Sequence, residues 1–255
     1  VMSEYYPART NVPGDEIFRV EGFTQPGVFR DISFNLRKGE ILGVAGLMGA
    51  GRTEIMRAIF GVDPHESGKL YFEGKEIHIK NPRDAIRHGF GFITENRKTE
   101  GLILDFSIER NIALPSEERL AQSHVINDKK EFDFSSELSK RLGVKAQDIN
   151  LPASTLSGGN QQKVVIAKWV GMHPKLLILD EPTRGIDIGA KKDIYDLMNE
   201  LTAKGVSIIM VSSELPEVIG MSDRILVIHE GRAAGIVEHK DATQTRIMTL
   251  ATGGE

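Results

Sequence analysis

A glycine-rich stretch at positions 45–53, with the sequence AGLMGAGRT, constrains the fold of this chain more than any other segment. It follows an apolar run, Ile41–Val44, that predicts a buried strand, and it precedes Ile55–Phe60, which predicts a helix ended by Gly61. A strand, a glycine loop and a helix together form a phosphate-binding loop, because the glycines let backbone N–H groups converge on an anion and the helix N-terminus adds its dipole. The alternative is a glycine turn that binds no ligand.

The loop departs at one position from the usual pattern, G-x-x-x-x-G-K-[ST]. Gly46, Gly51 and Thr53 match this pattern, but Arg52 stands where lysine is usual. Lysine is a compact charge and arginine a longer planar fork, so we expect Arg52 to pair with phosphate in a different geometry. Thr53 is placed to bind Mg²⁺. The residues assigned to phosphate are Gly46, Leu47, Met48, Gly49, Ala50, Gly51, Arg52 and Thr53.

The composition is typical of a soluble protein with a full-sized core, since 40% of the 255 residues are apolar. The net charge is −4 with acids and bases interspersed, which gives no basic surface for nucleic acid. The chain has no cysteine and therefore no disulfide framework. No apolar run is long enough to span a membrane, so we expect any membrane role to come through a partner.

The remaining patterns predict an α/β protein. Residues 1–15 have no clear periodicity, are interrupted by prolines and a glycine, and are interpreted as a linker. Strands at 16–23 and 28–36 and a hairpin over 69–79 predict an antiparallel β layer beside the phosphate-loop core. A helical pattern with charged faces over 102–153 predicts a helical insert. Further strands are expected at 90–94, 206–211, 225–228 and 234–237, and helices at 81–88 and 190–203.

A second glycine motif, LSGGNQQK, occupies Leu156–Lys163. A helix is expected to follow it, with Val165, Ile166 and Trp169 on one face. Ser157 and the two glycines then stand at the helix N-terminus, which is a second possible anion site. Taken alone, the segment is more simply an N-cap and a turn.

The apolar run Leu176–Leu179 ends in two adjacent carboxylates, Asp180 and Glu181. An apolar strand tipped by aspartate is the arrangement that holds Mg²⁺ through water, and the following glutamate is placed to polarise an attacking water. The alternative is two acids on a solvated strand end. A polar cluster, Glu95–Lys98, follows another expected strand at the same edge of the sheet. The histidines lack metal-ligand spacing.

With its LSGGNQQK signature between the phosphate loop and the aspartate-tipped strand, the chain resembles an ATP-binding cassette (ABC) ATPase. The resemblance covers residues 16–237 and follows the order of that family, ending with Asp187 in the D-loop. It implies a P-loop NTPase (RecA-like) core with an antiparallel β subdomain and an inserted α-helical subdomain. It also implies one cassette over residues 16–255, with the helical subdomain at about 100–160 including the start of the signature, and ATP and Mg²⁺ as cofactors.

The chain is most similar to the C-terminal cassette of the tandem ATP-binding proteins of bacterial monosaccharide importers, of the ribose and galactose type. The motifs that carry this resemblance are Gly46–Thr53, Glu95–Lys98, Leu156–Lys163 and Asp180–Lys192, and Val1–Pro7 resembles the junction after a first cassette. The resemblance implies an N-terminal cassette in the same full-length chain and transmembrane permease subunits. It also implies, indirectly, a periplasmic or extracellular sugar-binding protein, and a peripheral place on the cytoplasmic face of the cell membrane.

Three positions depart from the wider ABC pattern. Arg52 replaces the loop lysine, Glu95 replaces the glutamine that senses the γ-phosphate, and Ser213 replaces the switch histidine. A carboxylate repels phosphate, and serine lacks the charge and reach of histidine, so we expect this nucleotide site to be impaired. Phe23 and Phe29 are candidates for the aromatic that stacks on adenine, although places in the core are favoured for both.

Because ABC cassettes work in pairs, the resemblance implies that this signature completes the ATP site of the other cassette. The nucleotide-binding residues then also include Glu95, Ser157, Gly158, Gly159, Gln161 and Asp187. Glu181 and Ser213 are the catalytic residues, and Thr53 and Asp180 bind the metal. We expect an ABC-type ATPase whose isolated half has low activity. The alternatives are a regulatory cassette that binds nucleotide without hydrolysis, an importer of nucleosides, and a soluble ABC ATPase of translation or DNA repair. The last is disfavoured because the chain lacks a basic surface and a long coiled coil.

Overall fold

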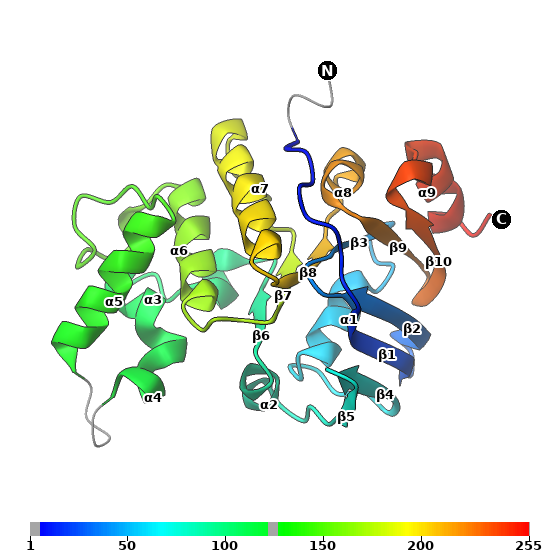
Figure 1. The fold of residues 1–255 in the computed structure, drawn as a ribbon, viewed down its shortest axis with the longest axis horizontal. Coiled ribbons are helices and arrows are strands. Elements are labelled where there is room, and N and C mark those ends of the chain that lie inside the picture. Colours follow the sequence, from blue (N-terminus) through cyan, green and yellow to red (C-terminus); the bar gives the residue numbers. More distant parts are fainter. Residues whose placement is uncertain (1–5, 122–126, 255) are drawn as a thin grey trace.

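The structure is a computed structural model that describes residues 6–121 and 127–254. A six-stranded sheet forms its centre, and a four-stranded antiparallel sheet lies beside it (Figure 1). The expected fold class is confirmed, with a phosphate loop on an α/β core, an antiparallel β layer and inserted helices. The strands are β1 (Glu16–Gln25), β2 (Phe29–Arg37), β3 (Ile41–Gly46), β4 (Ser67–Phe72), β5 (Lys75–Ile77), β6 (Phe90–Ile93), β7 (Leu176–Asp180), β8 (Ser207–Val211), β9 (Arg224–His229) and β10 (Arg232–Glu238).

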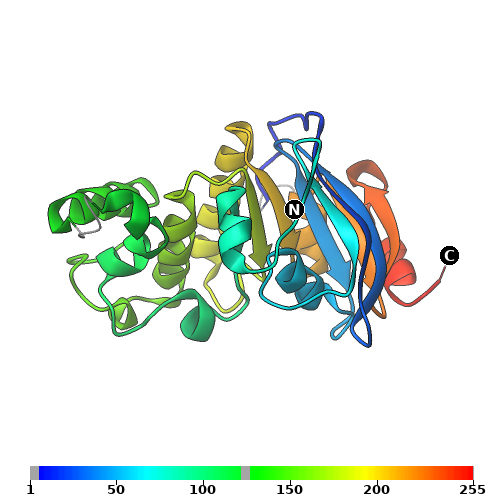
Figure 2. The ribbon, with the colours of Figure 1, turned by 90° about the horizontal axis from the view of Figure 1, so that it is seen from below.

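The described helices differ in length and place. Helices α3–α5 lie at one end of the molecule and α9 at the other (Figures 1 and 2). The helices are α1 (Arg52–Ile59), α2 (Pro82–Arg87), α3 (Ile108–Ala113), α4 (Glu117–Leu120), α5 (Asp128–Arg141), α6 (Gly158–Val170), α7 (Ile188–Ala203), α8 (Leu215–Met221) and α9 (Gln244–Ala251). A π-helical turn spans Arg97–Gly101, and 3₁₀ turns span Leu114–Ser116, Ala153–Thr155 and His239–Asp241.

The central sheet has the strand order β10-β9-β3-β8-β7-β6. The strands from β9 to β6 are parallel, and β10 pairs antiparallel with β9. Every residue of β7 and β8 is buried, because helices cover one face and the antiparallel sheet with α1 covers the other. Leu177 and Leu179 pack with residues of α6 and α7, whereas Leu176 and Ile178 pack with α1 and the antiparallel sheet.

The antiparallel sheet has the order β2-β1-β4-β5, and aromatic rings pack between it and the central sheet. Phe90 meets Phe18 and Phe72 edge to face, with ring centroids 5.4 and 4.9 Å apart. Phe23 and Phe29 stack on each other at 5.7 Å and are 0% and 3% exposed. Both rings therefore belong to the core, and neither is presented to an adenine.

Helix α6 is buried around almost its whole circumference. The helix expected after the signature is present, and its burial extends beyond the face that carries Val165 and Ile166, because the consecutive residues Val164–Ala167 are all buried. The cause is its place between the central sheet on one side and α3 and α5 on the other (Figure 1). The helix that carries the signature is thus held by both the core and the inserted helices.

Two described helices, α8 and α9, were not expected from the sequence pattern. Pro216 in the first turn of α8 and Thr243 at the N-cap of α9 are the start signals that mark them. Within residues 6–121 and 127–254, no helix has both the length and the apolar character needed to cross a bilayer.

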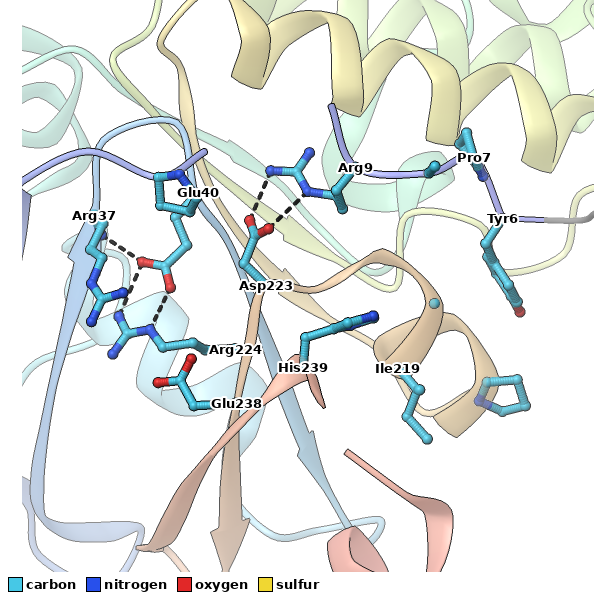
Figure 3. A pocket seen from close by; sticks show the side chains of 14 residues that line it. Tyr6, Pro7, Arg9, Arg37, Glu40, Ile219, Asp223, Arg224, Glu238 and His239 are labelled. Carbon is cyan, nitrogen blue, oxygen red and sulfur yellow. Dashed lines mark hydrogen bonds and ion pairs between the residues drawn. The ribbon is translucent and has the colours of Figure 1, made fainter. Parts of the chain in front are cut away.

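A buried ion pair ties the central sheet to the antiparallel sheet. Arg224, at the start of β9, donates from Nε to Glu40 Oε1 at 2.5 Å and from Nη2 to Glu40 Oε2 at 3.0 Å (Figure 3). The same guanidinium donates to the carbonyl of Asn35 on β2 at 2.9 Å. Glu40 is 0% exposed and Arg224 is 6% exposed, so each charge depends on the other for compensation.

We expect Glu40→Gln to lower the free energy of unfolding by about 3–5 kcal/mol, because it leaves the Arg224 guanidinium buried without its counter-charge. Urea unfolding measures the loss. The matched control is Glu21→Gln, since Glu21 forms an exposed pair with Arg19 and its loss should change stability little. Equal losses in the two variants would contradict the buried pair's role.

Candidate functional site

The glycine loop lies between β3 and α1, as expected. Gly49 and Gly51 adopt φ of 77° and 96°, which favours glycine at both positions. A Cβ on Gly46 would lie 2.5 Å from the carbonyl oxygen of Ile228 on the neighbouring strand. No side chain caps the N-terminus of α1, and Met48 in the loop is 98% exposed. The loop therefore presents backbone N–H groups that can donate hydrogen bonds to an anion.

Arg52 extends from the loop toward the ends of the neighbouring strands. Its Nη1 donates to the carbonyl oxygen of Ser212 at 2.7 Å, just beyond β8. Its Nη2 lies 4.0 Å from Glu181 Oε1, and the Ser213 hydroxyl donates to Glu181 Oε2 at 3.1 Å. The structure thus brings together three residues that the sequence placed in the site, Arg52, Glu181 and Ser213. We call this arrangement the Glu181 clamp.

The backbone at Glu181 is strained, with a φ of 49° in a residue that is not glycine. Burial raises the pKa of its carboxyl, while hydrogen bonds from Ser213 and the charge of Arg52 oppose that rise. Glu181 is therefore held in one orientation by the clamp rather than free in solvent.

Asp180, at the end of β7, is 0% exposed. Neither of its carboxylate oxygens has a hydrogen-bond partner in the part of the chain that the structure describes. Burial raises the pKa of this carboxyl to about 6, and the neighbouring Thr53 hydroxyl opposes that rise. A buried carboxylate with two free oxygens beside a threonine hydroxyl fits a divalent cation, and these are the two residues expected to hold it.

No cluster of three or more His, Asp or Glu side chains able to hold a metal occurs among residues 6–121 and 127–254. A Mg²⁺ ion here would consequently take most of its ligands from phosphate oxygens and water, as Mg²⁺ usually does.

Glu95 makes its contact away from the phosphate loop. Its carboxylate forms an ion pair with Arg184, which lies in the turn between β7 and α7. Arg97, two residues on, donates to the carbonyls of Arg184 at 2.9 Å and Gly185 at 3.3 Å. The polar cluster at the end of β6 therefore binds the turn between β7 and α7, and within this cluster only Glu95 had been expected to be a site residue.

The π-helical turn that carries Arg97 is anchored on two sides. Lys168 of α6 donates from Nζ to the carbonyl of Gly101 at 2.5 Å, and burial lowers the pKa of Lys168 to about 8. Arg57 of α1 pairs with Glu100 at 3.3 Å. π-helical turns are rare and are found frequently at functional sites, so this turn marks Arg97 as a candidate site residue. The sequence pattern alone does not predict the turn.

Ser157 caps α6 and is exposed at its N-terminus, where its hydroxyl accepts from the Asn160 side chain at 3.0 Å. The two signature glycines face other parts of the same chain. A Cβ on Gly158 would lie 2.6 Å from Arg97 Nη2, and one on Gly159 would lie 2.7 Å from the Cβ of Ala190 on α7. These glycines are thus needed for packing within the chain.

The last two residues of the expected nucleotide set make internal contacts. Gln161 is 5% exposed and donates to the carbonyl of Ala153 at 3.3 Å, so its side chain points into the protein. Asp187 caps α7 by accepting from the N–H of Ala190 at 3.0 Å. Among the described residues, no hydrogen bond or ion pair joins residues 157–159 to the loop at 46–53.

The sequence profile of the ABC transporter family matches residues 29–184. The ribose import ATP-binding protein RbsA of Bacillus subtilis (strain 168) is 59% identical over 253 residues, covering 99% of this chain and 51% of that protein. The protein of the same name from Lactococcus lactis subsp. lactis (strain IL1403) is 54% identical over 254 residues, covering 100% and 51%. The chain spans about half the length of the curated relatives it matches.

Solved structures show the same fold at low sequence identity. A nucleotide-free ATP-binding cassette from an ABC transporter aligns with a TM-score of 0.80 and 20% identity, over 94% of this chain and 100% of that one. A cassette in its ADP conformation aligns with a TM-score of 0.79 and 20% identity, over 93% and 99%.

The two signature glycines make a matched pair for a test of packing. We expect Gly159→Ala to lower the free energy of unfolding by about 1–3 kcal/mol, because the added methyl meets the backbone-fixed Ala190 and α7 must shift. Gly158→Ala should cost less, since the flexible end of Arg97 is able to move aside. Denaturant unfolding of both variants compares them, and a larger loss for Gly158→Ala would refute this packing.

Proposed function

We propose, since this chain belongs to the ABC transporter family, that it is the ATP-binding cassette that forms the C-terminal half of a sugar importer's ATP-binding protein. The name of the relatives that it matches over nearly its whole length, ribose import ATP-binding protein, supports ribose as the sugar. The cassette takes ATP and Mg²⁺ and contributes to ATP hydrolysis that drives import.

The proposed partners follow from that role. They are an N-terminal cassette in the same full-length chain, the transmembrane permease subunits and, indirectly, a sugar-binding protein outside the membrane. The cassette then lies on the cytoplasmic face of the cell membrane and comprises residues 16–255, with residues 1–15 as the linker. Residues 1–5 of the proposed junction lie outside the described part of the chain.

The residues present divide the chemistry between them. The backbone of the loop at 46–53 would bind the phosphates, and Asp180 and Thr53 would hold Mg²⁺, which would supply positive charge against the phosphate oxygens. Glu181 orients the attacking water and accepts its proton. Ser213 holds the carboxylate of Glu181 in place by the hydrogen bond at 3.1 Å.

The Glu181 clamp is the observation that supports an unequal division of labour. Arg52 donates a hydrogen bond to the Ser212 carbonyl and lies beside Glu181. The positive charge of this loop position, which is expected to face phosphate in other ABC cassettes, therefore faces the proposed catalytic carboxylate. Glu95 is paired with Arg184. We infer that the chain's own site turns over slowly, while its exposed Ser157 completes the ATP site of the other cassette. The same clamp favours a second candidate, a regulatory cassette that binds nucleotide without hydrolysis.

We expect Asp180→Asn to separate stability from nucleotide binding. Without nucleotide, the variant should be more stable by about 1–3 kcal/mol, because an amide costs less to bury than an unpaired carboxylate. The rise in Tm that Mg-ATP gives the wild type should be lost. Thermal unfolding with and without Mg-ATP measures both, with Asp241→Asn, an exposed change, as the control. An unstabilised variant that keeps its Mg-ATP response would refute the assignment.

The unequal division itself predicts how two variants of the full-length protein differ. Ser157→Arg should remove most ATPase activity, because a bulky side chain at the exposed N-terminus of α6 holds the two cassettes apart. Arg52→Ala should cost much less, since a slow site has little turnover to lose. Both are assayed in the assembled transporter with saturating sugar-loaded binding protein. If Arg52→Ala is as damaging as Ser157→Arg, the two halves hydrolyse ATP equally, and the proposed unequal division of ATP hydrolysis is wrong.

A further inference from the structure

Residues 6–14, which we call the strap, contain no helix or strand and run between α7 and α8 toward β1 (Figure 1). At its far end the strap joins the β-layer, where the N–H of Gly14 donates to the carbonyl of Lys38 at 2.8 Å. Its side chains make contacts that are unusually specific for a segment without regular structure.

Arg9 anchors the strap at its middle. The guanidinium donates twice to Asp223, at 3.1 and 2.8 Å (Figure 3). It also donates from Nη1 to Asn199 at 2.6 Å and to Thr202 at 2.8 Å. The arginine side chain is only 12% exposed. Asp223 also accepts from the N–H of Ile41 at 2.8 Å, at the start of the strand that leads to the phosphate loop. A bidentate arginine with three acceptor side chains fixes both position and direction.

Tyr6 anchors the strap at its near end. Its ring centroid lies 5.3 Å from that of Tyr195 on α7, with the planes at 47°. A Cβ on Gly220 of α8 would lie 2.4 Å from Cγ of Tyr6, so only glycine leaves room for the ring. The ring therefore occupies a notch between α7 and α8.

A pocket of about 670 Å³ lies beside the strap, and Ile219, Glu238 and His239 are among the residues that line it (Figure 3). The strap is also held by Asn11, which donates to the carbonyl of Gly39 at 2.8 Å. Among these contacts, the ring of Tyr6 is the one that meets Tyr195 on α7.

Tyr195 connects the strap to the turn that follows Glu181. Its hydroxyl donates to Glu217 Oε1 at 2.9 Å, and the hydroxyl of Thr183 donates to the same oxygen at 2.5 Å. Glu217 and Thr183 are each 1% exposed, so this is a closed buried network. Thr183 lies two residues after Glu181. A continuous chain of contacts therefore leads from Tyr6 to the turn that carries the catalytic carboxylate.

We propose that the strap is a positioning element for this turn, and that Tyr6, Tyr195 and Glu217 are positioning residues that act on Glu181 through Thr183. The role of Glu181 rests on the proposed function, whereas the coupling of the strap to residues 181–187 does not. In a full-length chain with a cassette ahead of the strap, movement of that cassette reaches the Glu181 turn by this route.

Hydrogen exchange tests the coupling without any need for ATP hydrolysis. In the 255-residue chain, Tyr6→Ala should speed exchange at residues 181–187 by roughly threefold to tenfold relative to β9, as expected for the loss of one aromatic contact. Tyr195→Phe keeps the ring beside Tyr6 but removes the hydroxyl from Glu217, and should give the same increase. The double variant should add little, because both changes break one pathway. Val12→Ala, an exposed change on the strap, should have no effect.

An unchanged ratio of exchange between residues 181–187 and β9 in Tyr6→Ala overturns the proposal, and so does an additive double variant. ATPase assays of the full-length protein form a separate arm. There Tyr6→Ala should slow hydrolysis at this half's own site, followed as single-turnover phosphate release with the catalytic glutamate of the other cassette replaced by glutamine, without weakening nucleotide binding. If the full-length protein shows no ATPase activity while the exchange response is present, the proposed function fails and the coupling stands.

Discussion

Asp180 brings a carboxylate to a place in the sheet where no hydrogen-bond donor among the described residues meets either oxygen. A folded protein tolerates such a group only where something else compensates it, and here the neighbours are the Thr53 hydroxyl and the open end of the phosphate loop. The strand order places β7 and β3 on either side of β8, so both functional segments emerge at one edge of the sheet. A magnesium-bound phosphate between them would compensate the charge of Asp180 and accept hydrogen bonds from the uncapped N-terminus of α1.

Around this centre, the two charged side chains at positions expected to face phosphate, Arg52 and Glu95, contact the protein itself. Arg52 reaches the Ser212 carbonyl and Glu181, and Glu95 pairs with Arg184. These contacts hold the Arg52 and Glu95 side chains in place, and they leave less of the positive charge of Arg52 available to a phosphate. The signature has the opposite character, because its serine is exposed while its glycines pack against Arg97 and α7. The side chains of the proposed nucleotide site contact one another, whereas the signature serine is exposed. This combination fits the proposed role as one half of an unequal pair.

Local patterns were enough to predict the strands, the phosphate loop and the aspartate-tipped β7, because each rests on the order of neighbouring residues. The burial of α6 on nearly all sides could not be predicted from its sequence, since its surroundings come from α3 and α5 as well as the sheet. Contacts across the chain left no local signal. Arg9 and Asp223 are 214 positions apart, and Thr183 and Glu217 are 34 apart. The π-helical turn that carries Arg97 likewise depends on Lys168, which belongs to another helix.

Single-turnover hydrolysis by this half alone is the most direct test of the unequal division. The full-length protein would carry a glutamine in place of the catalytic glutamate of the other cassette, so that Glu181 is the remaining base. Phosphate release from bound Mg-ATP is then followed within the assembled transporter. We expect release far slower than from the unmodified transporter, and slower still when Glu181→Gln is added to the same protein. Release at the rate of the unmodified transporter, abolished by Glu181→Gln, would contradict the unequal division.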